Sequence, residues 1–211
     1  MVYSHIRLPR KLVQINSIFW SALIMRNMIQ FYINGEWVDP VKPNTCDVYN
    51  PSNGEVCGQI SMGSSADVDI AVNAANQAFN TFSLSSKKER LELLESILKI
   101  LIERNEEIAK AIMEEMGAPW TLALKAQAES GPQQFKAIID VLKNYSFEEM
   151  IGSTCVAKEA IGVCAMITPW NWPISQIALK VAPALAAGCT MILKPSEIAP
   201  FNAMLFTQAL H

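Results

Sequence analysis

The stretch Gly162-Val163-Cys164-Ala165-Met166-Ile167-Thr168-Pro169-Trp170-Asn171-Trp172-Pro173 decides the fold of this 211-residue chain. An apolar run ends at a Thr-Pro break, a Trp-Asn-Trp-Pro cluster follows, and an alanine-rich segment begins. The pattern predicts a strand, a crowded turn and a helix, and α/β proteins place ligands at the carboxyl end of such strands. The amide between two tryptophans is therefore either part of a well-packed corner or a group placed for chemistry.

The segment after this turn predicts a βαβ unit. The helix is expected to open at the first-turn proline Pro173 and to end at Gly188, and a short buried strand, Thr190 to Lys194, follows. A strand, crossover helix and strand of one sheet run parallel. The sequence therefore predicts an α/β fold, and a further helix is expected to start at Pro200.

The first part of the chain predicts short antiparallel strands. Asn34-Gly35 between β-forming residues is a strong hairpin signal, and residues 48–56 repeat the pattern with a longer turn. Residues 154–158 and 162–167 are expected to form another strand pair.

Helices are predicted between these strand regions. Capping boxes at Ser64 with Asp67 and at Ser86 with Glu89 mark two helix starts. Asn105 is expected to cap a third helix that Gly117 ends, and Gly131-Pro132 to interrupt a fourth. The predicted buried faces of the first two helices consist of Val68, Val72, Ala75 and Phe79, and of Leu91, Leu94, Leu98 and Leu101.

The composition narrows the possible function classes. The chain is 51% hydrophobic and 18% charged with a formal net charge of −3, which indicates a globular protein and excludes a basic nucleic-acid-binding surface. Five cysteines and two histidines with no Cys-x-x-Cys do not support a metal site. All five thiols are expected to be free and to pack as small apolar side chains.

Residues 1–28 differ from the rest of the chain. They are basic, and the first acidic residue is Glu36. They could be a mitochondrial presequence, a poor signal peptide, or sequence upstream of a true start at Met25 or Met28. We favour the third interpretation and expect this atypical extension to lie outside the fold.

Four motifs, in this order, resemble the aldehyde dehydrogenase superfamily. They are Tyr32-Ile33-Asn34-Gly35-Glu36-Trp37, Asn50-Pro51 with Gly54, Thr168-Pro169-Trp170-Asn171-Trp172-Pro173, and Lys194-Pro195-Ser196-Glu197. The last two motifs are specific, because a Pro-Trp-Asn followed one βαβ crossover later by Lys-Pro-x-Glu is not a generic pattern. The resemblance covers about residues 30–211 and matches roughly the first two-fifths of a family member.

This resemblance implies an architecture. Residues 29–211 would form an incomplete NAD(P)-binding domain with short antiparallel strands, helices, and an incomplete Rossmann-like parallel sheet. The start of a β-extension used in oligomerisation would lie at about residues 146–161. A full-length family member is expected to be a homo-oligomer.

The resemblance also implies a reaction, the oxidation of an aldehyde to a carboxylic acid through a covalent thiohemiacetal and thioester. Asn171 would lend its side-chain amide to the oxyanion hole, and the residues facing the cofactor would be Ile167, Thr168, Pro169, Trp170, Lys194, Ser196 and Glu197. The family's nucleophilic Cys and general-base Glu lie beyond the end of this chain. We therefore expect the chain alone to be inactive.

The cofactor follows from two charges. Glu197 could accept hydrogen bonds from ribose hydroxyls and would repel a 2′-phosphate, which favours NAD. Lys194 could pair with a 2′-phosphate, which leaves NADP open, and the two residues could also form a plain surface ion pair.

Two other functions remain possible. The chain could be a non-catalytic protein that pairs with a full-length homologue through residues 154–159, or a membrane-tethered protein that uses residues 1–28. We expect a cytoplasmic location, with the mitochondrion as the alternative that the basic N-terminus suggests.

Overall fold

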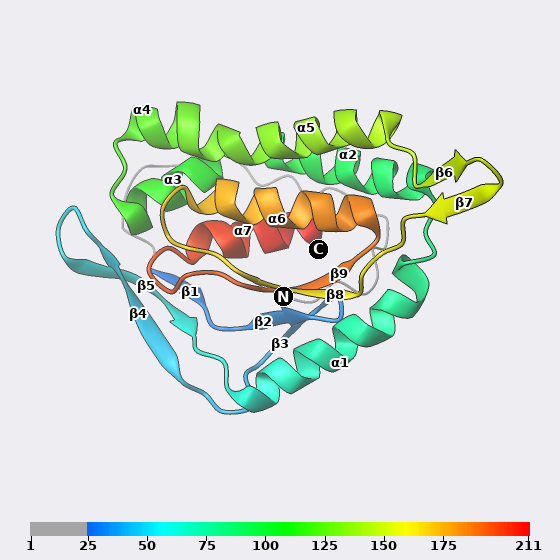
Figure 1. The fold of residues 1–211 in the computed structure, drawn as a ribbon. Helices are drawn as coiled ribbons and strands as arrows, with labels where there is room; N and C mark the ends of the chain where they lie inside the picture. Colours follow the sequence, from blue (N-terminus) through cyan, green and yellow to red (C-terminus); the bar gives the residue numbers. More distant parts are fainter. Residues whose placement is uncertain (1–24) are drawn as a thin grey trace.

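The computed structural model describes residues 25–211, and Figure 1 shows the arrangement of its helices and strands. The strands are β1 (Arg26–Met28), β2 (Phe31–Ile33), β3 (Glu36–Val38), β4 (Thr45–Asn50), β5 (Glu55–Ser61), β6 (Glu148–Ile151), β7 (Thr154–Ala157), β8 (Val163–Ile167) and β9 (Thr190–Lys194). The helices are α1 (Ser65–Phe82), α2 (Lys87–Glu103), α3 (Asn105–Met116), α4 (Trp120–Leu122), the π-helix η1 (Ala123–Ala128), α5 (Glu129–Asn144), α6 (Pro173–Ala187) and α7 (Phe201–Leu210).

The βαβ unit predicted from the sequence is confirmed. Strands β8 and β9 run parallel, with Ile167 opposite Lys194, and α6 connects them. Pro173 is the first residue of α6, and Gly188 ends it in the left-handed region with φ 83°. In Figure 1 α6 and α1 lie on opposite sides of the two strands. The α/β prediction therefore holds for the part of the chain that carries the candidate site.

The face of α1 that packs on these strands differs from the prediction. Of the predicted residues only Ala75 is fully buried, whereas Val68 is 52% exposed. The buried apolar residues of the helix are Ala71, Ala74, Ala75 and Ala78. Alanines allow the helix backbone to approach the sheet closely, and the carbonyl of Ala75 accepts a hydrogen bond from Thr190 Oγ1 at 2.8 Å. The larger apolar residues do not mark the buried face of α1, because close contact between the helix backbone and the sheet requires small side chains.

Both predicted hairpins are present. Asn34 and Gly35 turn between β2 and β3 with positive φ of 55° and 79°, and β4 pairs antiparallel with β5. Strand β1 pairs parallel with the other edge of β5. The predicted boundary at residue 28 is therefore wrong, since residues 26–28 belong to the fold. Residues 1–24 lie outside the described residues.

Three predictions in the helical region need correction. Asn105 is the first residue of α3 rather than its cap, and the buried face of α2 is centred on Leu94, Ile97 and Leu101, with Leu91 and Leu98 only partly buried. The sequence Gly131-Pro132 lies inside α5 and does not interrupt it.

The π turn that precedes α5 gives a physical reason for the tolerated proline. A helical proline crowds the carbonyl four residues earlier, which for Pro132 belongs to Ala128, the last residue of η1. Backbone hydrogen bonds span five residues in a π turn, so the regular spacing is already relaxed there. The neighbouring Gly131 allows α6 to approach, because a Cβ at this position would lie 2.8 Å from Ile174 Cγ1.

The strand pair predicted from residues 154–158 and 162–167 is wrong. Strand β7 pairs antiparallel with β6, and β8 pairs with β9 instead. All residues of β6 and β7 are exposed, and the hairpin projects from the body in Figure 1. Cys155 lies on this hairpin and is exposed, which corrects the prediction that every cysteine packs in the interior.

Three charged residues are buried in the described helices, Asp67, Arg90 and Glu115. Arg90 belongs to α2. It is 7% exposed and donates from Nη2 to the carbonyl of Ser83 at 2.8 Å and from Nε to Ser85 Oγ at 2.9 Å. Its Nη1 donates to the carbonyl of Ala186 at 3.4 Å. The cation thus satisfies carbonyls at the ends of α1 and α6, where the helix dipoles favour positive charge.

Gly188 provides a test of this arrangement. Its φ is 83°, and a Cβ there would lie 2.4 Å from Arg90 Nη2, whereas Gly54 has φ 75° with nothing within 4 Å of its Cβ position. Gly54→Ala should cost about 1–2 kcal/mol for backbone strain alone. Gly188→Ala should cost about 1–3 kcal/mol more, since the buried guanidinium must move. Urea unfolding of both variants measures the difference, and equal costs would contradict the contact.

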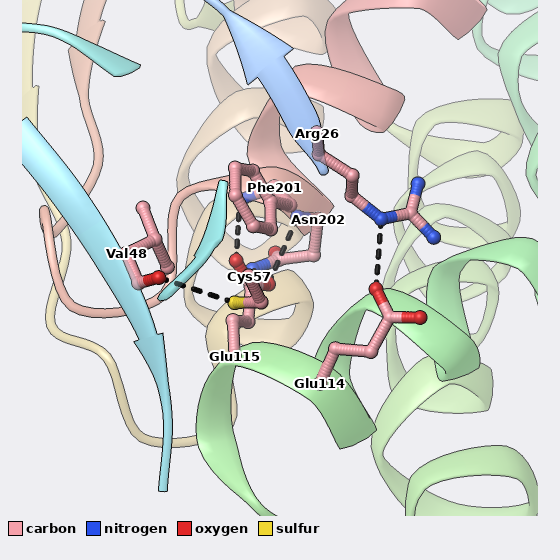
Figure 2. Close-up of polar contacts among 7 residues, drawn as sticks. All are labelled: Arg26, Val48, Cys57, Glu114, Glu115, Phe201 and Asn202. Atoms are coloured by element: carbon pink, nitrogen blue, oxygen red, sulfur yellow. Dashed lines mark hydrogen bonds and ion pairs between the residues drawn. The ribbon is translucent and has the colours of Figure 1, made fainter. Parts of the chain in front are cut away.

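Glu115 is the most deeply buried of the three, and it joins α3 to α7 (Figure 2). It is 1% exposed and accepts hydrogen bonds from the backbone N–H of Phe201, from the N–H of Asn202 at 2.9 Å and from Asn202 Nδ2 at 2.7 Å. Burial raises the pKa of Glu115 from 4.5 to about 7, although the three donors act in the opposite direction.

This pKa gives stability a pH dependence. Between pH 4.5 and about 7 the unfolded chain releases the Glu115 proton while the folded chain retains it. The contribution of the protonated Glu115 to the free energy of unfolding is therefore full below pH 4.5 and is lost as the pH rises through 7. It amounts to about 3 kcal/mol. Glu114, the neighbouring carboxylate, pairs with Arg26 and serves as the control. Measured with urea across this pH range, the free energy of unfolding should fall in wild type and in Glu114→Gln but not in Glu115→Gln. If Glu115→Gln shows the same pH dependence of stability as wild type, Glu115 is excluded as the source of that dependence.

Candidate functional site

The carboxyl ends of β8 and β9 bring the two predicted parts of the site together. The register places Ile167 beside Lys194, and the N–H of Thr168 donates to the carbonyl of Lys194 at 3.2 Å, one residue past the strand. The loops of residues 168–172 and 195–200 therefore start side by side. This is the edge at which open parallel sheets present ligand-binding residues.

The first loop ends in a sharp corner at Trp172. Its backbone lies in the left-handed region with φ 52° and ψ 51°, a conformation that bulky residues rarely adopt. Such strain costs about 1–3 kcal/mol, and it is concentrated at functional sites. The corner sets Asn171 directly before the N-terminus of α6, where the residue is exposed.

The exposure of the two tryptophans decides between the two interpretations of this corner. Trp170 is 47% exposed and Trp172 is 42% exposed. Packing inside the described part of the chain therefore does not explain the pair. A corner that presents an amide between two accessible indole rings is better suited to contact with another molecule or another segment.

The residues predicted to face a cofactor do not all lie at the surface. Ile167, Pro169 and Trp170 are exposed and form an apolar strip that continues the line of β8. Thr168 is buried, and its N–H is engaged with β9. Three of the four residues of this segment are thus accessible to a ligand.

The last residue of β9 and the second loop together hold a pair of opposite charges. Lys194 Nζ lies 2.6 Å from Glu197 Oε2, and both side chains are about half exposed. The hydrogen bond from Lys194 lowers the pKa of Glu197, so the carboxylate is ionised at neutral pH. Ser196 Oγ accepts from the N–H of Ile198 at 3.2 Å and shapes the turn between them.

An apolar cleft of about 260 Å³ adjoins this loop. Lys194 and Glu197 line it together with residues of β2, α1 and α7. Residues 167–171 are not part of its lining. The cleft is slightly smaller than most small-molecule pockets.

Sequence reasoning missed Glu115 and Arg90 as organising residues. The signal was present, because Glu115 follows Ile108 and Ile112 at helical spacing and Arg90 precedes Leu94 by one turn. A charged residue in phase with an apolar stripe is expected to be buried and paired. Both positions could have been found by that rule.

Residues 25–211 contain neither a candidate metal cluster nor a helix suited to cross a membrane. Within this range no cluster of three or more His, Cys, Asp or Glu side chains is placed to hold a metal ion. None of the described helices has the length and apolar run that a membrane crossing requires.

Comparison with known proteins gives one consistent result. The model of the aldehyde dehydrogenase family matches residues 37–211. A 3-succinoylsemialdehyde-pyridine dehydrogenase from a Pseudomonas species is 52% identical over 185 residues, which is 87% of this chain and 39% of that protein.

Solved structures agree with this match. The aldehyde dehydrogenase from Bartonella henselae aligns with a TM-score of 0.86 and 49% identity over 88% of this chain and 40% of its own. Aldehyde dehydrogenase C from Pseudomonas syringae, in complex with NAD+ and octanal, aligns with a TM-score of 0.87 and 44% identity over 90% of this chain and 40% of its own.

The chain thus spans about two-fifths of the length of these relatives. The family model covers far more than half of the chain, and the α/β architecture and the loop motifs at its sheet edge agree with that match. The chain belongs to the aldehyde dehydrogenase family.

Proposed function

We propose that this chain supplies the cofactor-facing part of an enzyme that oxidises an aldehyde to a carboxylic acid with NAD as the hydride acceptor. The observation that carries the proposal is the junction of the loop of residues 168–172 with the end of β9 and the loop that follows it, residues 194–197, at one edge of the β8–β9 pair. The Pseudomonas syringae relative is described in complex with NAD+ and an aldehyde, which supports the same pairing of cofactor and substrate class.

Asn171 would serve as the oxyanion donor. Its amide carries N–H groups that can stabilise the negative oxygen formed when a nucleophile adds to the aldehyde carbonyl. The strained Trp172 and the first-turn Pro173 hold the corner that carries Asn171. A donor that is already oriented stabilises the transition state without reorganising during the reaction.

Glu197 and Lys194 would bind the adenosine ribose of the cofactor. Only one carboxylate oxygen of Glu197 is engaged with Lys194, so the other can accept from a ribose hydroxyl. The exposed strip of Ile167, Pro169 and Trp170 offers an apolar wall for the rest of the nucleotide. These residues fit NAD, which would supply the hydride-accepting chemistry when bound.

Two further proposals concern the cellular location of the protein and its oligomerisation. We place it in the cytoplasm, because all five cysteines are free thiols and disulfides are rare in that compartment. We assign homo-oligomerisation of the full-length enzyme to the region of residues 146–161. The exposed β6–β7 hairpin supports this assignment, since Met150 and Ile151 are 63% and 62% exposed.

The same hairpin supports an alternative function. An exposed strand edge with apolar side chains can pair with another chain. The protein could then act without catalysis, by joining a full-length homologue through residues 154–159. Co-purification with such a homologue, lost when β6 and β7 are deleted, would favour this function over the enzymatic one.

The cofactor assignment predicts a change in selectivity at Glu197. The chain should bind NAD more tightly than NADP, because the carboxylate repels a 2′-phosphate. Glu197→Gln should weaken NAD binding about tenfold and narrow the difference between the two nucleotides. Isothermal titration calorimetry measures both affinities. Glu92→Gln, which removes the carboxylate of another exposed Lys–Glu pair, is the control and should change neither value.

The oxyanion assignment predicts a loss of turnover at Asn171. The chain alone should form no NADH from NAD and octanal, since it is expected to lack the nucleophile. Joined to the remaining three-fifths of the Bartonella henselae enzyme it should be active, and Asn171→Ala should then lower kcat about 100- to 1000-fold. The exposed Asn76→Ala is the control. Full activity of Asn171→Ala would refute the oxyanion assignment, and NADH formation by the isolated chain would refute its expected inactivity.

A further inference from the structure

The contact between Glu115 and α7 continues into the loop that carries Glu197 and directly follows Lys194. Asn202 Nδ2 donates to Glu115 Oε1 at 2.7 Å and also to the carbonyl of Ala199 at 2.8 Å. Ala199 lies two residues after Glu197 in the loop of residues 195–200. A continuous chain of hydrogen bonds therefore leads from the end of α3 to the loop that approaches the proposed ribose site.

The groups around Glu115 are engaged with other partners (Figure 2). Arg26 Nε pairs with the neighbouring Glu114 at 2.8 Å, and the thiol of Cys57 lies 3.3 Å from the carbonyl of Val48. The hydrogen bonds described for the Glu115 carboxylate all come from Phe201 and Asn202. Glu115 is thus directed at α7 rather than at the ion pair beside it.

The loop needs such a support from within. Its own ion pair, between Lys194 and Glu197, is about half exposed, and exposed ion pairs hold a loop conformation only weakly. The Glu115 contact is buried, and it satisfies N–H groups at a helix start that would otherwise lack partners. Buried bonds of this kind cost far more to break than exposed ones.

We propose that Glu115 is a positioning residue for the nucleotide site: by fixing the start of α7 and, through Asn202, the carbonyl of Ala199, it holds Lys194 and Glu197 in the orientation that a ribose requires. Glu115 acts without touching the nucleotide. The inference rests on the proposed function, because that function assigns the ribose to Lys194 and Glu197.

Three variants of the full 211-residue chain test the inference. Glu115→Ala removes the three hydrogen bonds that the Glu115 carboxylate accepts from Phe201 and Asn202. Asn202→Ala keeps the two backbone bonds to Glu115 but cuts the link to Ala199. Glu114→Ala removes the adjacent carboxylate on the same helix and is the matched control. Hydrogen–deuterium exchange of the backbone amides in residues 196–199 and 201–204 and calorimetric titration with NAD are measured for each.

We expect Glu115→Ala to accelerate exchange at Phe201 and Asn202 tenfold or more and to weaken NAD binding by a similar factor. Asn202→Ala should weaken NAD binding while the Phe201 amide stays protected, an effect that loss of overall stability would not produce. Saturating NAD should slow exchange in the loop of both variants, because binding favours the ordered loop. Glu114→Ala should behave as wild type.

The outcomes separate this inference from the proposed function. If the wild-type chain binds NAD and Asn202→Ala binds it with the same affinity, the positioning role is overturned. Equal effects of Glu114→Ala and Glu115→Ala would also overturn it. If Glu115→Ala does not fold, the Asn202→Ala result alone decides. If the wild-type chain binds no NAD, the proposed function fails, and exchange at residues 195–202 still shows whether Glu115 orders the loop.

Discussion

The pairing of β8 with β9 is the constraint on which the candidate site depends. Because the strands are parallel and Ile167 lies opposite Lys194, both following loops leave the sheet at the same level. A shift of one residue would turn the side chains of β9 to the other face and separate the two loops. The small residues of α1 let this helix pack closely on the two strands. The hydrogen bond from Thr190 Oγ1 to the carbonyl of Ala75 fixes the start of β9 against that helix.

Local signals in the sequence were reliable where the structure depends on neighbouring residues. Asn34-Gly35 predicted its turn because few residues adopt positive φ easily, and Asp67 accepts from the Ser64 N–H at 2.7 Å as a capping box requires. The site motifs were also visible, since Trp170, Asn171, Lys194 and Glu197 lie within short stretches. Their placement at one edge followed from the parallel connection alone.

The errors arose where packing between distant segments decides the structure. Strand β7 pairs with β6, whose first two residues are glutamates, although the segment after residue 161 is the more apolar candidate. The apolar pattern pointed to large side chains on the buried face of α1, but the face that packs on the sheet consists of alanines. The contact of Glu115 with Asn202 joins residues 87 positions apart, a distance over which periodicity carries no information.

The π-helix η1 has a consequence for how this fold tolerates change. A π turn holds one residue more than the α-helical turn it replaces, and each residue rotates a helix face by about 100°. The face of α5 that carries Phe135, Ile139 and Leu142 is thereby aligned with α6 and α2. Deleting one residue from Ala123–Ala128 would restore a regular helix and turn these side chains toward solvent. The extra residue therefore acts as a phase correction between two helical segments.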